Sequence, residues 1–156
     1  MTLFGDIDVL LAEDNPADAE LIIESLRNEN LADRLHRVHD GEEALDFLLA
    51  RGVYEGRALD RPPRLVLLDV KLPKVDGLKV LEELKRDPRT RPIPVVMLTS
   101  SNIEHDVARG YLLGANSYVQ KPVEYMRFQE TVRRLGLYWL ATNEAAPAVV
   151  FMRARE

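Results

Sequence analysis

The chain contains no cysteine, and this absence excludes several kinds of site. Disulfide bridges, zinc sites with thiolate ligands and cysteine nucleophiles all need a residue that none of the 156 positions holds. Long apolar runs are missing too: the longest uncharged apolar stretch, AAPAVVFM at 145–152, is far too short to span a membrane. The N-terminus lacks the basic region of a signal peptide, so we expect a cytoplasmic protein without a membrane partner.

An excess of positive charge is also lacking. The formal net charge is −5, which argues against a nucleic-acid-binding surface as the main function. The basic segment KRDPRTRP at 85–92 is the best evidence to the contrary. It has a simpler explanation, because helix dipoles favour cations at the helix C-terminus and prolines end helices. With 46% apolar and 30% charged residues, the composition is typical of one globular domain.

Predicted strands and predicted helices alternate along the chain. Apolar runs indicate strands at 7–12, 34–39, 65–68, 94–98 and 116–120, and helical patterns follow at 16–28, 42–50, 77–84, 104–113 and 125–141. Five such repeats imply right-handed crossovers and a doubly wound α/β fold, with a parallel sheet and helices on both faces. In such sheets a ligand binds beyond the carboxyl ends of the strands.

Polar side chains follow the predicted strands at this edge. Glu13 and Asp14 follow the first strand, Asp69 the third, Thr99 the fourth and Lys121 the fifth. If the first and third strands are neighbours, three carboxylates converge, and their mutual repulsion implies a cation. Oxygen ligands without histidine or cysteine favour Mg²⁺, while a lysine and a hydroxyl suit phosphoryl oxygens. Because aspartate can itself be a nucleophile, the set indicates phosphoryl transfer.

Each of these residues taken alone has an ordinary structural explanation. Glu13 and Asp14 could be acids at a helix N-terminus, and Asp69 could cap a loop. Thr99 could be an N-cap, and Lys121 could be a solvated surface lysine. Only their joint occurrence at strand ends favours a single functional site.

The same residues carry a resemblance to a known family. The motifs are LLAEDN at 10–15, DVKLPKVDG at 69–77, VVMLTS at 95–100 and YVQKP at 118–122. With these motifs, residues 7–141 resemble the receiver domain of two-component response regulators. The resemblance implies a flavodoxin-like, five-stranded parallel sheet with strand order 2-1-3-4-5. It also implies a receiver domain over 1–141, followed by a C-terminal tail over 142–156 and no separate output domain.

The resemblance assigns the acidic residues to phosphate and metal. Asp69 would be the phosphoacceptor. Mg²⁺ would be held by Asp14, Asp69 and the backbone carbonyl of Lys71, with Glu13 acting largely through metal-bound water. The Lys71 side chain could reach the phosphoryl group, so the phosphoryl lifetime is not predicted.

The resemblance also assigns roles at the last two strands. Lys121 would pair with the phosphoryl group, and Thr99 would donate a hydrogen bond to it. Thr99 and Tyr118 would form a switch that alters the surface of 104–113, 116–120 and 125–141. The Lys121–Pro122 peptide bond would be cis, against the low base rate of cis bonds before proline.

The implied function is a switch protein rather than an enzyme. It would accept a phosphoryl group from a sensor histidine kinase and signal through protein contacts. The stretches EDNPADAELI, DGEEALDFL, IPVVMLTSS and YWL resemble the single-domain regulators that partner phytochrome-type histidine kinases. A phosphate sink for the kinase would use the same residues. An aspartate-nucleophile phosphatase of the haloacid dehalogenase type expects a second acid where this chain has Lys71.

The last predicted helix is apolar around much of its circumference, which a helix with one buried face should not be. We therefore expect a homodimer through 104–113, 116–120 and 125–141. Burial of this surface under the tail is the alternative. The predicted dimer or partner face comprises Tyr118, Phe128, Leu137, Tyr138, Trp139 and Leu140.

Overall fold

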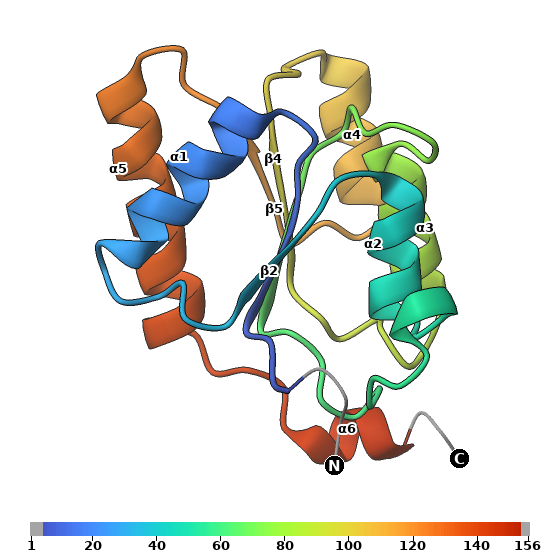
Figure 1. Cartoon of the computed structure of the whole chain (residues 1–156). Coiled ribbons are helices and arrows are strands. Elements are labelled where there is room, and N and C mark those ends of the chain that lie inside the picture. The colour runs from blue at the N-terminus through green and yellow to red at the C-terminus, as the bar shows by residue number, and fades with distance from the viewer. Residues whose placement is uncertain (1–4, 154–156) are drawn as a thin grey trace.

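Five parallel strands form the sheet, in the order β2-β1-β3-β4-β5, and this confirms the expected flavodoxin-like topology. A computed structural model describes residues 5–153 of the chain (Figure 1). The strands are β1 (Val9–Ala12), β2 (Leu35–Val38), β3 (Leu65–Leu68), β4 (Val95–Thr99) and β5 (Ser117–Gln120). Ala12 of β1 pairs with Leu68 of β3, so these neighbouring strands end side by side.

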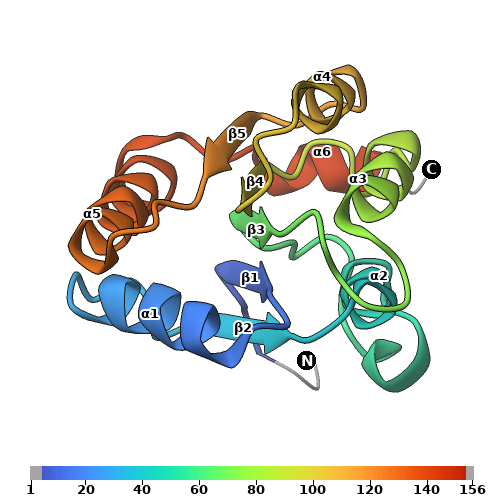
Figure 2. The same ribbon diagram turned by 90° about the horizontal axis from the view of Figure 1, so that it is seen from above.

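Helices cover both faces of the sheet. Seen from above in Figure 2, α1 and α5 lie on one side, and α2, α3 and α4 lie on the other. The helices are α1 (Pro16–Arg27), α2 (Gly41–Leu48), α3 (Gly77–Arg86), α4 (Glu104–Leu112), α5 (Tyr125–Gly136) and α6 (Ala148–Arg153); a 3₁₀ turn, η1 (Gly52–Tyr54), and a π-helical segment, η2 (Leu137–Thr142), complete the set. None of the helices in the described part of the chain has the length and apolar character needed to cross a membrane.

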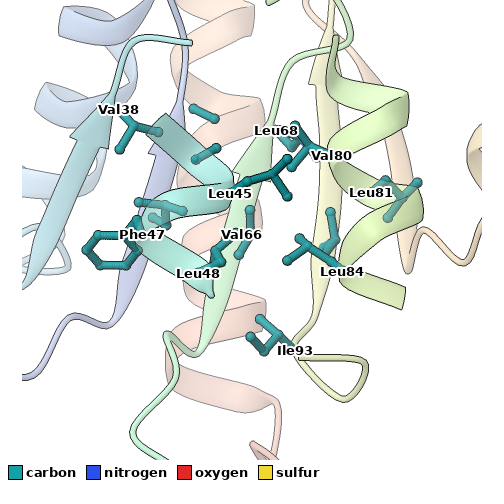
Figure 3. Close-up of a cluster of buried hydrophobic side chains, with 14 of the residues drawn as sticks. Val38, Leu45, Phe47, Leu48, Val66, Leu68, Val80, Leu81, Leu84 and Ile93 are labelled. Carbon is teal, nitrogen blue, oxygen red and sulfur yellow. The ribbon is translucent and has the colours of Figure 1, made fainter. Parts of the chain in front are cut away.

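Strand β3 is buried on both faces. Val66 and Leu68 belong to the apolar cluster beneath α2 and α3, whereas Leu65 and Leu67 belong to the cluster beneath α1 and α5. Figure 3 shows the first cluster, in which these β3 side chains lie between those of α2 and α3. Full burial of each such leucine stabilises the fold by about 1.5–3 kcal/mol. This explains why the strand is an uninterrupted apolar run rather than an alternating one.

The turn after β3 brings the start of α3 against the backbone of Asp69. The Gly77 N–H donates to the carbonyl oxygen of Val70 at 2.7 Å. A Cβ atom at residue 77 would lie 1.8 Å from the carbonyl oxygen of Asp69, a distance that no side chain can tolerate. Asp76 caps the helix by accepting a hydrogen bond from the Lys79 N–H at 3.0 Å. Glycine at position 77 therefore allows the start of α3 to approach the backbone of Asp69 closely.

The C-terminal part departs from the expected single helix over 125–141. Helix α5 passes at Leu137 into the π-helical segment η2, and after a short connection α6 packs across the lower end of the sheet (Figure 1). Phe151 of α6 is only 3% exposed and belongs to the core cluster beneath α2 and α3. The tail is thus part of the packed structure.

The prediction that Phe128 and Leu140 belong to an exposed partner face is wrong. Phe128 and Leu140 are buried in the cluster beneath α1 and α5, at 5% and 7% exposure. Phe128 lies on the stripe that the α-helical period itself directs to the core. Leu140 lies in the π-helical segment, where the wider turn changes the direction of side chains from that of an α-helix. Tyr138 is exposed, while Leu137 and Trp139 are half-buried.

Candidate functional site

Three carboxylates meet at the carboxyl ends of β1 and β3, as the sequence predicts. Oxygen atoms of Glu13, Asp14 and Asp69 all lie within 4.8 Å of one another. Glu13 and Asp69 are buried and Asp14 is exposed, so the cluster opens to solvent on one side. Neighbouring parallel strands in register force this approach, because Glu13 directly follows the last residue of β1, Asp14 is the next residue, and Asp69 directly follows the last residue of β3.

The ammonium group of Lys121 lies among these acids. Its Nζ donates to Glu13 Oε1 at 2.5 Å and to Asp69 Oδ2 at 2.8 Å. A third bond, to Asp18 Oδ2 at 2.9 Å, comes from the first turn of α1. The three protons of the ammonium group thus meet three carboxylates. We did not predict Asp18 as a site residue; its position one turn into the helix after β1 is the signal that could have identified it.

The electrostatics of the cluster indicate a deficit of positive charge. Burial raises the pKa of Glu13 to about 7; repulsion by Asp69 adds to this effect, and the hydrogen bond from Lys121 opposes it. Burial alone would lower the pKa of Lys121, but its hydrogen bonds to Asp69, Glu13 and Asp18 outweigh that effect and raise it. The lysine is therefore charged at neutral pH, yet one cation does not fully compensate the acids around it.

The donor set and the charge together fit a divalent cation. The side-chain atoms that the acidic cluster offers to a metal are all carboxylate oxygens, which are hard ligands. A divalent cation would supply the positive charge that Lys121 alone does not, and it would displace the proton that the raised pKa of Glu13 retains.

A chain of hydrogen bonds leads from Asp69 towards α4. The Thr99 hydroxyl donates to Asp69 Oδ1 at 2.7 Å, and the Lys71 backbone N–H donates to the same oxygen at 3.2 Å. The Ser101 N–H donates to Thr99 Oγ1 at 3.3 Å, and the Tyr118 hydroxyl donates to the Ser101 carbonyl oxygen at 3.0 Å. The two expected switch residues are thus connected through Ser101, whose role the sequence did not indicate.

The expected cis bond at Lys121–Pro122 is wrong. Between residues 5 and 153 the structure contains no cis peptide bond. The trans form is favoured before proline by about 0.5–1 kcal/mol, and only the resemblance suggested the exception. In the trans arrangement the Lys121 N–H donates to the Thr99 carbonyl oxygen at 2.7 Å, and the ammonium group already reaches the acids.

Comparison with known proteins places the chain in a family. The response regulator receiver domain family matches residues 9–133. The probable methanogenesis regulatory protein FilR2 of Methanothrix harundinacea (strain 6Ac) is 44% identical over 138 residues, which cover 88% of this chain and 86% of that protein. The response regulator Rcp1 of Synechocystis sp. (strain ATCC 27184 / PCC 6803 / Kazusa) is 39% identical over 134 residues, which cover 86% of this chain and 89% of that protein.

Solved structures agree with this result. The Mn²⁺-bound form of Rcp1 superposes with a TM-score of 0.83 at 38% identity, covering 88% of this chain and 97% of that one. The phosphorylated cyanobacterial phytochrome response regulator RcpA gives a TM-score of 0.83 at 37% identity, covering 90% and 99%. Sequence, fold and pocket therefore agree: the chain belongs to the response regulator receiver family, with a phosphoacceptor role in two-component signalling.

Proposed function

We propose that Asp69 accepts a phosphoryl group from a sensor histidine kinase of the phytochrome type, in the cytoplasm, and that the protein relays this signal through protein contacts. The observation that carries the proposal is the setting of the Asp69 carboxylate. Lys121 binds one of its oxygens and Thr99 the other, beside the acids of β1. Both donors are positioned where phosphoryl oxygens would arrive, so the pocket suits phosphoryl transfer.

In the transfer step, an oxygen of Asp69 attacks the phosphorus of the donor phosphohistidine. The new bond joins this oxygen to phosphorus, and the phosphorus–nitrogen bond of the donor breaks. Lys121 then pairs with a phosphoryl oxygen in place of the carboxylate oxygen it now binds, and the Thr99 hydroxyl turns to another. Burial of both side chains excludes water and strengthens these interactions.

We propose Mg²⁺ as the metal at the acidic cluster. Asp14, Asp69 and the backbone carbonyl of Lys71 would hold it, with Glu13 contributing largely through bound water. When bound, the metal would neutralise charge on the transferring phosphoryl group. The Mn²⁺-bound form of the relative Rcp1 supports a divalent ion in such a pocket.

The phytochrome pairing is supported by the similarity to RcpA, which is described as a phytochrome response regulator. The test is phosphotransfer from a phytochrome-type kinase labelled on its histidine, compared with an unrelated histidine kinase at equal concentration. We expect faster transfer from the phytochrome-type kinase and none to Asp69→Asn. Equal rates from both kinases would contradict the pairing but leave the phosphoacceptor role intact.

We further propose that phosphorylation alters the face formed by α4, β5 and α5 with its continuation η2, and that this face forms a homodimer. Its apolar members include exposed Tyr111, Leu112 and Tyr138 together with half-buried Tyr118. The hydrogen bonds from Asp69 through Thr99 and Ser101 to Tyr118 support the coupling. Light scattering before and after phosphorylation tests it: an unchanged monomer in both states would contradict the dimer.

A further inference from the structure

One partner of Lys121 lies outside the acidic cluster. Glu13 and Asp69 belong to the set of three acids that can hold a cation, but Asp18 does not. Asp18 lies instead in the first turn of α1, and its carboxylate is 2.9 Å from Lys121 Nζ. Of the three acids bound to the ammonium group, it is the one that a metal at the cluster would leave in place.

The local structure holds Asp18 in position. Its backbone N–H donates to the side chain of Asn15, which caps α1, at 3.0 Å. The backbone N–H of Asn15 in turn donates to Glu13 Oε2 at 3.2 Å. This short turn therefore connects the end of β1 to α1 and fixes the distance between Asp18 and the cluster.

Asp18 and Lys121 also lie together at a groove beside the acidic cluster. Both line a groove of about 360 Å³ that includes Ser100, Pro122 and Val123. The Asp18 side chain is 32% exposed, whereas that of Lys121 is 7% exposed. A lysine side chain is a flexible chain of four carbons, so an ammonium group released by two of its three acids can move away from the acceptor.

We propose that Asp18 is a positioning residue, which holds the Lys121 ammonium group beside Asp69 when a divalent cation occupies the acidic cluster of Glu13, Asp14 and Asp69. The proposal rests on the proposed phosphoacceptor function and adds a residue to it. Asp18 touches neither the metal nor the phosphoryl group; it acts through Lys121.

The kinetic test compares Asp18→Ala with Glu20→Ala, which removes an exposed acid from the same helix. The rate of phosphorylation by acetyl phosphate is measured across Mg²⁺ concentrations. At saturating Mg²⁺ we expect Asp18→Ala to react roughly three- to ten-fold more slowly, the range for one partly exposed charge-assisted hydrogen bond. Asp18→Glu should restore most of the rate, and Glu20→Ala should match the wild type.

Three kinetic outcomes would overturn the proposal. They are an unchanged rate at saturating Mg²⁺, a loss confined to Mg²⁺ affinity, and an equal loss in Glu20→Ala. The second outcome would show that Asp18 contributes only its charge to the metal site. Asp18→Leu keeps a side chain of similar size but removes both the charge and the acceptor oxygens, so it replaces Asp18→Ala if that variant folds poorly.

A second readout requires no phosphorylation and separates this proposal from the proposed function. Nitrogen-15 NMR detects a buried lysine ammonium group because its protons exchange slowly with water. With saturating Mg²⁺, we expect the Lys121 ammonium signal to persist in the wild type and in Glu20→Ala, and to exchange at least three-fold faster in Asp18→Ala. Equal exchange in all three proteins would refute the positioning role even if Asp69 is phosphorylated normally. Failure of wild-type phosphorylation with the expected exchange pattern would instead refute only the phosphoacceptor function.

Discussion

Replacing Lys121 with methionine should destabilise the metal-free protein, and by an amount that depends on pH. Methionine keeps an unbranched side chain of similar length but removes the charge that three carboxylates share. Removing one partner of a buried ion pair costs about 3–5 kcal/mol, because the other charge is left without compensation.

The surroundings of the three acids place the loss near the lower end of that range. The Asp18 carboxylate is 32% exposed, so solvent screening reduces the contribution of its bond. Asp69 keeps the hydrogen bond from Thr99 on its other oxygen. Glu13 can take up a proton, because burial already raises its pKa to about 7. We therefore expect a loss of about 3 kcal/mol in the free energy of unfolding at pH 8.

The pH dependence follows from proton binding. Without the ammonium group the pKa of Glu13 rises further, so between pH 7 and 8 the folded variant holds a proton that the folded wild type releases. The variant's stability should thus fall relative to the wild type by about 1 kcal/mol over that pH unit. Urea unfolding with EDTA at pH 6, 7 and 8 measures both effects, with Lys79→Met as the control at an exposed ion pair. A loss below about 1 kcal/mol at pH 8, or an equal loss at pH 6 and pH 8, would refute this reasoning.

Three further variants test the acidic cluster, the packing of the C-terminal tail, and the space that α4 leaves for the Tyr118 ring. Burial raises the pKa of Glu13 from 4.5 to about 7, so ionisation of this residue destabilises the folded state as the pH rises between these values. In EDTA the free energy of unfolding of the wild type should therefore decline by about 3 kcal/mol between pH 4.5 and 7, and Glu13→Gln should remove this decline. Identical pH profiles for the variant and the wild type in urea unfolding would contradict this. Phe151→Ala should cost about 3 kcal/mol in urea unfolding because it empties a core position, whereas Val149→Ala, at an exposed position of α6, should cost under about 0.5; equal losses would show that α6 does not pack on the core. A Cβ at Gly110 would lie 3.0 Å from the Tyr118 ring. Gly110→Ala should therefore stabilise the protein by about 1 kcal/mol, through helix propensity, only when Tyr118→Ala has removed the ring. An equal stabilisation with and without the ring, measured by thermal unfolding, would show that Tyr118 does not need this space.

The sheet could be predicted because its signals are local. Each strand is a short apolar run, and the run at 65–68 lacks polar alternation because β3 is covered on both faces. The strand-end residues could be predicted as one site because all parallel strands end at the same edge. Strand order is different: repetition of strand and helix fits several orders, and only the resemblance indicated 2-1-3-4-5.

What could not be predicted depends on how the helices pack. An acid in the first turn of a helix is ordinarily explained by the helix dipole, and the bond of Asp18 to Lys121 arises only when the fold brings the start of α1 within reach of the residue that follows β5. Leu140 looked exposed because an α-helical period was assumed where the chain forms a π-helix. The apolar residues of the tail gave no sign of their partner, because Phe151 fills a core position formed by segments far away in the sequence.

The measurement that tests the proposed function most directly is the mass of the intact protein after incubation with acetyl phosphate or a phosphorylated sensor histidine kinase, in Mg²⁺. We predict the addition of one phosphoryl group that is labile to base, that maps to Asp69, and that is absent with EDTA or in Asp69→Asn. A phosphoryl group on another residue, an equal yield in Asp69→Asn, or no addition from either donor while Mg²⁺ is bound would contradict the assignment of Asp69 as the phosphoacceptor.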